Sequence, residues 1–223
     1  RVDTVSWVNQ DVCVAVGVVP VGMAAVEFGG NANQSTDWFD AALEEIDGAE
    51  RPVTWSEADG LDVQAIAAAE PDLILAVYSG ITQEDYDRLS KIARTIAYPK
   101  DVPAFGTSWQ QSTQIIGRAL GREDRAKELV ADLERQIADA GAEHEALQGA
   151  TFVYGTVDPA AADQISIYTD VDNRPQFLEQ LGMEQAEVVR ENSPQDQEFF
   201  FTWSPERADE LESDVFVSWA AAE

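Results

Sequence analysis

Histidine and cysteine are nearly absent from this chain of 223 residues, which has one histidine and one cysteine. A single cysteine excludes an intramolecular disulfide and a thiolate metal cluster. Cys13 lies in the apolar segment DVCVAVGV, where a buried and unreactive thiol is expected. His144 lies in the polar segment AEHEAL near a predicted helix end, so a solvated position is expected for it. A Ser-His-Asp triad would depend on this one residue.

Basic residues are also scarce. The chain has 14 lysines and arginines against 42 aspartates and glutamates, which gives a net charge of -28. A surface of this sign repels nucleic acid and anionic lipid, so neither is expected as a partner. No apolar run approaches the roughly 20 residues that cross a bilayer as a helix.

Phosphate-binding loops are missing as well. The sequence has no Walker loop and no G-x-G-x-x-G fingerprint, and Phe28-Gly29-Gly30 lacks the spacing of either. Carboxylates are so abundant that a pair of them indicates little, because acidic runs are usually solvated faces. These absences argue against nucleotide-dependent catalysis and leave a ligand-binding role open.

The most informative segment present is Leu61–Ile81, LDVQAIAAAEPDLILAVYSGI. Asp62 is placed to cap a helix, and Pro71 ends that helix because the residue before a proline is driven out of the helical region. Residues 73–77 are continuously apolar, as in a strand covered on both faces of a parallel sheet; a buried helical segment is the alternative. The segment therefore predicts a helix followed directly by a buried strand.

A similar unit recurs near the end of the chain, where residues 204–219 read SPERADELESDVFVSW. Two copies of one helix-strand unit predict two similar lobes with a cleft between them. In the first lobe strands and helices alternate, which indicates a parallel α/β sheet. The predicted strands there are 2–7, 18–23, 73–77 and 95–98, and the helices are 11–16, the segment before Pro71, 83–93 and 109–120. Residues 24–60, rich in Gly, Asn, Asp and Ser, are predicted to form a long functional or mobile loop.

A long helix is predicted over residues 123–146, with apolar residues at helical spacing on one face. It would span about 36 Å, enough to bridge two lobes, although an ordinary surface helix fits the pattern too. Strands 151–157, 165–168 and 199–203 and a helix at 175–181 follow. We therefore predict an α/β protein of two Rossmann-like lobes with parallel sheets, at residues 1–121 and 147–223, joined by one helix at 122–146. The second lobe is short, so a missing C-terminal portion is expected.

Aromatic residues stand at many of the predicted strand ends. Ligands of parallel α/β sheets bind beyond the carboxyl ends of the strands. For any one aromatic, burial in the core is equally expected. Together they predict a cleft with aromatic walls. The strand-end residues are Trp7, Tyr78, Tyr98, Tyr154, Tyr168, Trp203 and Trp219, with Trp38 and Trp109 in or beside the adjoining loops.

Three longer segments carry a resemblance to a known family. They are AIAAAEPDLILAVYSGITQEDYDRLSKIARTIAYP, IGRALGREDRAKELVADLE and YGTVDPAAADQISIYTDVDNRPQFLEQLGM. Their order resembles the substrate-binding proteins of ABC importers for iron-siderophore, haem and cobalamin compounds, most of all the ferric-siderophore group. The resemblance runs over nearly the whole chain, although each motif alone is diffuse.

The resemblance implies two α/β lobes joined by a rigid helix, with an iron chelate held in the cleft and no catalytic activity. It implies no cofactor besides the transported ferric siderophore, a monomer, and an extracytoplasmic location as a lipoprotein or in a periplasm. Docking on an ABC permease through one acid on each lobe is also implied, and Glu57 and Glu206 are the expected docking residues. The sequence departs from the family in lacking the signal, the lipid-anchor cysteine and the closing helical segment.

The resemblance also suggests ligand-binding residues. Aromatic faces would pack on the organic skeleton of the chelate, and a guanidinium would donate paired hydrogen bonds to iron-bound oxygens. No residue is expected to bind the metal directly. The predicted ligand-binding residues are Tyr78, Trp109, Tyr168, Arg174, Trp38 and, less directly, Arg190.

The small number of basic residues limits the charge of the chelate that the chain is expected to bind. Only five basic residues are expected in loops: Arg51, Lys100, Arg174, Arg190 and Arg207. A triply anionic catecholate complex needs several desolvated cations, because buried unpaired charge is costly. A hydroxamate-type or otherwise weakly charged ferric chelate is therefore predicted. Haem or a corrinoid is the alternative cargo, with tyrosine in place of histidine as the haem ligand. An α/β enzyme using cleft carboxylates and Tyr78 is the alternative from another class.

Overall fold

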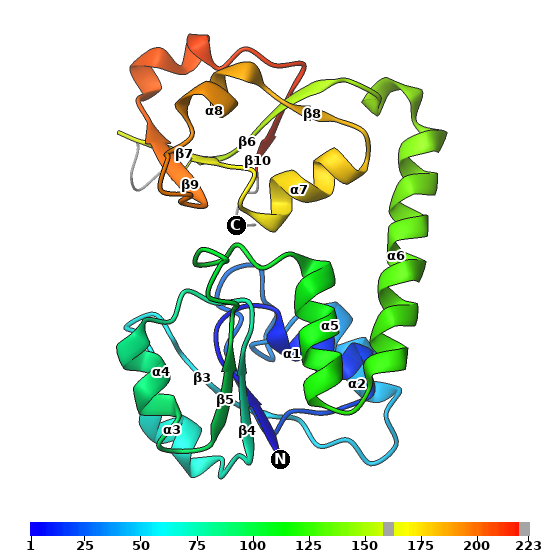
Figure 1. Ribbon diagram of the computed structural model, residues 1–223, viewed down its shortest axis with the longest axis vertical. Helices are drawn as coiled ribbons and strands as arrows, with labels where there is room; N and C mark the ends of the chain where they lie inside the picture. Colours follow the sequence, from blue (N-terminus) through cyan, green and yellow to red (C-terminus); the bar gives the residue numbers. More distant parts are fainter. Residues whose placement is uncertain (158–162, 219–223) are drawn as a thin grey trace. The chain divides into compact units, whose positions relative to one another are not determined.

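The computed structural model describes residues 1–157 and 163–218 and contains two compact units, Arg1–Val130 and Ala131–Glu223 (Figure 1). The predicted long helix is present as α6 (Glu123–Glu143) and ends three residues earlier than predicted. The division between the two units falls within this helix. The predicted domain boundaries, with a separate helical segment at 122–146, stay a prediction. Trp219 lies outside the described residues.

The first unit is built on a five-stranded sheet in which all neighbours are parallel, as predicted for this lobe. The strand order is β3-β2-β1-β4-β5, so the direction of progression reverses between β1 and β4. Parallel α/β sheets bind ligands at such a reversal, beyond the carboxyl ends of the strands. The strands are β1 (Val2–Thr4), β2 (Gly22–Ala24), β3 (Val53–Trp55), β4 (Leu73–Ala76) and β5 (Arg94–Ala97).

Helices cover both faces of this sheet (Figure 1). Ile74 of β4 packs with Ile66 and Leu89 on one face, whereas the next residue, Leu75, packs with Cys13 on the other. Successive side chains of β4 thus enter two different cores, which explains its continuous apolar run. Helices α3 and α4 lie on the first face and α1, α2 and α5 on the second. Their bounds are α1 (Asn9–Ala15), α2 (Asp37–Glu44), α3 (Val63–Ala68), α4 (Gln83–Leu89) and α5 (Trp109–Ala119).

Two predictions about local chemistry are confirmed in this unit. Asp62 caps α3, because its carboxylate accepts hydrogen bonds from the backbone N–H groups of Gln64 and Ala65 at 3.1 and 3.0 Å. Cys13 is fully buried, and burial raises the pKa of its thiol to about 12. The thiol is therefore protonated and unreactive near neutral pH.

The predicted long loop at residues 24–60 is wrong, because α2 and β3 lie within it. Helix α2 begins after Thr36, whose hydroxyl accepts a hydrogen bond from the backbone N–H of Phe39 at 3.1 Å. Phe39 and Leu43 are one helical turn apart, and both are buried. The capping residue and this apolar pair outweigh the loop-forming composition around them.

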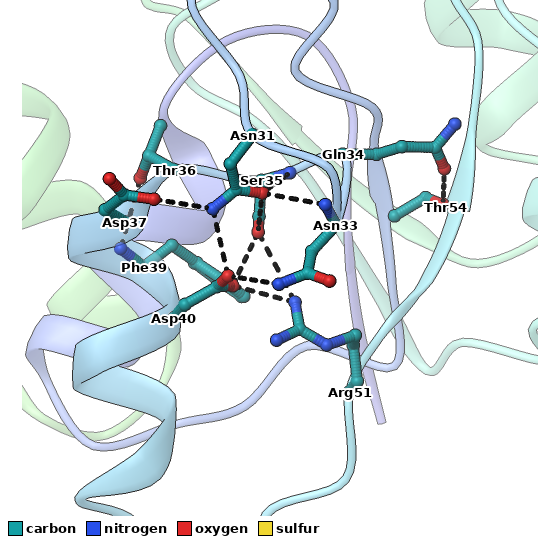
Figure 2. A network of polar contacts seen from close by, with 10 residues as sticks. All are labelled: Asn31, Asn33, Gln34, Ser35, Thr36, Asp37, Phe39, Asp40, Arg51 and Thr54. Atoms are coloured by element: carbon teal, nitrogen blue, oxygen red, sulfur yellow. Dashed lines mark hydrogen bonds and ion pairs between the residues drawn. The ribbon is translucent and has the colours of Figure 1, made fainter.

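A network of polar side chains holds the segment before α2 in place (Figure 2). Four groups donate to the carboxylate of Asp40: Ser35 Oγ at 2.5 Å, Arg51 at 2.7 Å, and the amides of Asn33 and Asn31 at 2.7 and 3.0 Å. The Arg51 guanidinium, with these other donors, holds the pKa of Asp40 well below its usual range. The network closes residues 31–35 onto the first turn of α2.

Close packing of the backbone tightens the same segment. A Cβ built on Gly30 would lie 1.9 Å from the carbonyl oxygen of Val26, so only glycine fits there. The N–H of Val26 donates to the carbonyl of Gln34 at 2.9 Å. Residues 26–34 therefore form a closed loop, which is anchored by Asp40 and carries Phe28 at the protein surface.

We expect Asp40→Asn to lower the free energy of unfolding by about 2 kcal/mol, because charge-assisted hydrogen bonds are replaced and the arginine loses its partner. Urea denaturation at neutral pH, followed by tryptophan fluorescence, measures the change. Asp37→Asn is the matched control, since the exposed carboxylate of Asp37 accepts one hydrogen bond from Asn31. Equal effects of the two substitutions would contradict the central role of Asp40.

The second unit holds a mixed sheet, so the prediction of a parallel sheet in this lobe is wrong. Strand β6 is parallel to β8 and β10 but antiparallel to β7, and β7 is antiparallel to β9. Only residues 158–164 connect β6 to β7, and a parallel crossover needs a dozen residues or more. The described elements are η1 (Glu145–Leu147), β6 (Thr151–Val157), β7 (Ile165–Tyr168), α7 (Asn173–Gln180), β8 (Glu184–Gln185), α8 (Glu187–Asn192), β9 (Phe200–Trp203), η3 (Pro205–Glu210) and β10 (Val215–Ser218).

The repeat predicted from the sequence is only partly present. The segment after Ser204 forms a 3-10 helix with a kink at Arg207 instead of an α-helix. Strand β10 follows it, as predicted, and pairs in parallel with β6. Its side chains are mostly exposed, whereas those of β4 are buried. Trp203, expected among the strand-end aromatics of the cleft, is instead buried in the core of this unit with Val153 and Ile167.

Candidate functional site

The loop between β1 and α1 in the first unit has an unusual backbone. Ser6 and Val8 have φ angles of 64° and 54°, in the left-handed region that residues other than glycine rarely adopt and that a β-branched residue such as Val8 strongly disfavours. Strained backbone of this kind persists only where the surrounding structure enforces it, and it clusters at ligand-binding sites. Trp7 lies between the two strained residues, at the carboxyl end of β1.

One buried side chain, that of Asn9, enforces this loop conformation. Its amide Nδ2 donates to the carbonyl oxygens of Val5, Trp7 and Tyr78 at 2.9, 3.0 and 3.0 Å. Its Oδ1 accepts from the backbone N–H of Tyr78 at 3.1 Å. Asn9 thereby ties the loop after β1 to the loop after β4, at the point where the strand order reverses.

A pocket of about 140 Å³ opens beside this loop and lies wholly in the first unit. Trp7 and Phe28 form an aromatic pair on it, with ring centroids 6.4 Å apart and ring planes 22° from parallel. Both are exposed, Trp7 to 44% and Phe28 to 61%. The pocket is lined by Ser6, Trp7, Gln10, Ala24, Ala25, Val26, Glu27, Phe28, Glu57 and Ala58. An aromatic pair left exposed at a pocket fits the skeleton of an organic ligand.

Two acidic side chains line this pocket. Its lining residues include Glu27 and Glu57 and, within the described part of the chain, neither lysine nor arginine. Both oxygens of Glu57 accept hydrogen bonds, one from the Ser6 backbone N–H at 2.9 Å and one from Trp55 Nε1 at 3.3 Å. Burial raises the pKa of Glu57, and the nearby Glu27 raises it further. Glu57, predicted to dock on a permease, thus lies in the pocket wall, where it also supports the strained loop.

The other aromatic residues predicted in this unit lie in different settings. Tyr78 is half-buried after β4, and its ring meets Phe105 edge-on at 5.8 Å between centroids. Trp109 is half-buried as the first residue of α5. Trp38 lies in the first turn of α2, not in a loop, and is 81% exposed. Tyr98 donates its hydroxyl to the carbonyl of Ile81 at 3.0 Å and packs against the core.

In the second unit, Arg174 and Tyr168, both predicted to bind the ligand, are in contact with each other. The guanidinium carbon of Arg174 lies 3.7 Å from the centroid of the Tyr168 ring and 5.8 Å from that of Tyr154. Tyr168 also stacks on Phe199, with centroids 6.4 Å apart. Asp172, the residue that caps α7, binds the same guanidinium with both carboxylate oxygens. The result is a cluster of half-buried aromatic rings, inclined to one another, with an oriented cation stacked on the ring of Tyr168.

The remaining predicted residues of this unit lie apart from that cluster. Arg190 was expected in a loop but is an exposed residue in the last turn of α8. Glu206 is exposed at the start of η3, where its backbone N–H donates to Ser204 Oγ at 3.3 Å. The docking roles of Glu57 and Glu206, and the ligand-binding roles of the six predicted residues, stay predictions.

Sequence reasoning missed three contributors to these surfaces. Phe28 was noted only beside a glycine pair, Asn9 was not singled out, and Asp172 was read as part of a motif. An Asp two residues before Arg at a helix start is a usable signal for the Asp172 pair, whereas the role of Asn9 depends on a strand order that the sequence does not give.

Within residues 1–157 and 163–218, no group of three or more His, Cys, Asp and Glu side chains is arranged to hold a metal ion. His144 is exposed next to η1. No helix in the same ranges is long and apolar enough to cross a membrane.

Both units have α/β folds, and comparison with known proteins identifies the family of the chain. The family model for periplasmic binding proteins matches residues 28–210, and the chain belongs to this family. A crystal structure of PiaA from Streptococcus pneumoniae in complex with ferrichrome is 32% identical, with a TM-score of 0.88 over 100% of this chain and 74% of that one.

Curated relatives agree with the family. A probable siderophore-binding lipoprotein of Bacillus subtilis, YfiY, is 26% identical over 93% of this chain. The ferric enterobactin-binding periplasmic protein FepB of Escherichia coli is 33% identical over 56% of this chain. The chain spans 59% of the length of the first relative and 38% of the second.

Proposed function

We propose that this chain binds a ferric siderophore outside the cytoplasmic membrane and delivers it to an ABC permease, without any catalytic step. The observation that carries the proposal is an aromatic cluster in each unit: the exposed pair of Trp7 and Phe28 in the first, and the half-buried Tyr168 with Arg174 stacked on it in the second. Ring faces suit the organic skeleton of a chelate, and a guanidinium suits its iron-bound oxygens. The predicted cleft between the lobes stays part of this proposal.

We further propose that the chelate is of the neutral hydroxamate type. Three singly charged hydroxamates neutralise Fe³⁺, whereas three doubly charged catecholates leave a triply anionic complex. Glu27 and Glu57 line the first-unit pocket, and where they are ionised they would repel that anion at short range. A neutral complex avoids this repulsion.

The predicted loop cations support the same choice. Three of the five are paired with acids: Arg51 with Asp40, Arg174 with Asp172, and Arg207 with Glu210. These pairs leave less positive charge to compensate an anionic ligand than the sequence suggests. The relatives differ in the chelate that is named for them: PiaA is described in complex with ferrichrome, and FepB as binding ferric enterobactin. Haem or a corrinoid remains the alternative cargo.

Quenching of tryptophan fluorescence tests the proposal. The protein is titrated with ferrichrome as the neutral probe and with ferric enterobactin as the anionic probe, and we expect saturable quenching with tighter binding of ferrichrome. Iron-free ferrichrome is the matched control for absorption and nonspecific effects. Tighter binding of ferric enterobactin would overturn the hydroxamate preference, and no saturable binding of either complex would overturn the function.

A further inference from the structure

The arginine of the second-unit surface is held by a buried carboxylate. Asp172 is 1% exposed and lies immediately before α7. Its Oδ1 accepts from Arg174 Nε at 2.8 Å and its Oδ2 accepts from Nη2 at 2.7 Å. Oδ1 also accepts from the backbone N–H of Arg174 at 2.8 Å. Two parallel bonds of this kind fix the plane of a guanidinium as well as its position.

The same contact sets the charge of the surface. Arg174 stacks on Tyr168 and lies near Tyr154, and its side chain keeps 39% exposure, so part of the guanidinium can meet a ligand. Because the Asp172 charge lies within hydrogen-bonding distance, the pair as a whole is neutral. The surface therefore offers N–H donors of fixed direction without a net positive charge.

We infer that Asp172 determines ligand specificity by holding Arg174 on the Tyr168 ring and cancelling its charge, so that the site selects a neutral ferric chelate over an anionic one. This inference rests on the proposed function. Asp172 does not touch the ligand in this account, and it acts through Arg174 as a positioning residue.

Substitution of Asp172 by asparagine separates the two effects of the carboxylate. Asparagine keeps the shape and the helix cap but removes the charge. For Asp172→Asn we expect about tenfold weaker binding of ferrichrome, because the guanidinium loses its two-point hold, and about tenfold tighter binding of ferric enterobactin, because the surface gains a positive charge. The measured quantity is the ratio of the two dissociation constants, which should change about a hundredfold.

Asp170→Asn is the matched control. Asp170 is exposed, lies two residues away and carries the same charge, and no hydrogen bond or ion pair is described between it and Arg174. For Asp170→Asn we expect the ratio of the two dissociation constants to stay within about twofold of the ratio for the unsubstituted protein, since exposed charges are screened by salt. An equal shift from both substitutions would overturn the inference, because net charge alone would then explain it.

A second variant, Asp172→Glu, tests the inference if Asp172→Asn does not fold. Asp172→Glu keeps the charge but moves the carboxylate by one methylene, so ferrichrome should bind more weakly and ferric enterobactin should gain nothing. If ferrichrome binds the unsubstituted protein and neither variant changes the ratio as stated, the inference fails while the proposed function stands. If neither complex binds the unsubstituted protein, the proposed function fails and the inference fails with it.

Discussion

Arg174→Ala should weaken the binding of ferrichrome by roughly 10- to 100-fold, the cost of losing hydrogen bonds from a charged donor. The guanidinium is the one cation stacked on the aromatic rings of Tyr154 and Tyr168 within the described residues. Arg174→Lys should recover little of the lost affinity, because an ammonium neither stacks flat nor donates as a fork. Fluorescence titration with ferrichrome measures both variants.

Loss of Arg174 also affects stability, and this effect must be separated from binding. Arg174→Ala leaves Asp172 buried without its partner, which destabilises a protein by about 3–5 kcal/mol in comparable cases. The double variant Asp172→Asn with Arg174→Gln removes both charges, so it should regain stability without regaining affinity. Arg135→Ala, in an exposed pair on α6, is the charge-matched control and should bind normally. Recovery of ferrichrome binding in the double variant would contradict a direct role for the guanidinium.

Asp3→Asn should abolish much of the dependence of stability on pH above pH 4. Asp3 is fully buried on β1, and burial raises its pKa from 3.8 to about 7, with Glu57 adding to the effect. Its Oδ1 would lie 2.7 Å from a Cβ on Gly22, so the carboxyl group is packed against the neighbouring strand. Its Oδ2 has no hydrogen-bond partner among the described residues.

The direction of the pH dependence follows from the numbers of protons that the folded and unfolded states bind. Between pH 4 and 7 the folded protein keeps a proton on Asp3 that the unfolded chain has released, so the free energy of unfolding falls as pH rises through this window. The difference of about three pKa units corresponds to about 4 kcal/mol, fully lost above pH 7. Asparagine cannot ionise, so the variant should match the unsubstituted protein near pH 4 and exceed it by up to about 4 kcal/mol at pH 8.

Urea denaturation at pH 4.5, 6 and 8 measures the effect. Asp11→Asn is the graded comparison, because burial raises the pKa of Asp11 to about 6 and its penalty should be complete one pH unit earlier. Parallel stability curves for the unsubstituted protein and Asp3→Asn at all three values would show that Asp3 ionises normally in the folded state.

The fold of the first unit could be predicted where local signals and burial agree. The apolar run of β4 and the cap at Asp62 gave correct elements because each is decided by neighbouring residues. Helix α2 was missed because its Asn- and Ser-rich approach reads as a loop, although Thr36 and the pair Phe39 and Leu43 mark the helix. Strand direction in the second unit depends on connection length, and the connection between β6 and β7 is too short for a parallel crossover.

The candidate site was predicted unevenly for a similar reason. Arg174 and Tyr168 follow one another closely in sequence, so the resemblance brought them together and the structure places them in contact. Trp7 and Phe28 come from different loops, and the loop that carries Phe28 is held by side-chain hydrogen bonds that the sequence pattern does not reveal. Composition indicates that aromatics are available, but it does not separate exposed rings from core rings such as that of Trp203.

The hydrogen bonds of Asn9 affect the thermodynamics of ligand capture. A loop that orders only on binding loses conformational entropy at that moment, which weakens affinity. Here the amide side chain of Asn9 already fixes the backbone of Trp7 and Tyr78. Preorganisation of this kind favours fast association, and it leaves differences in residence time to decide which chelate the protein retains.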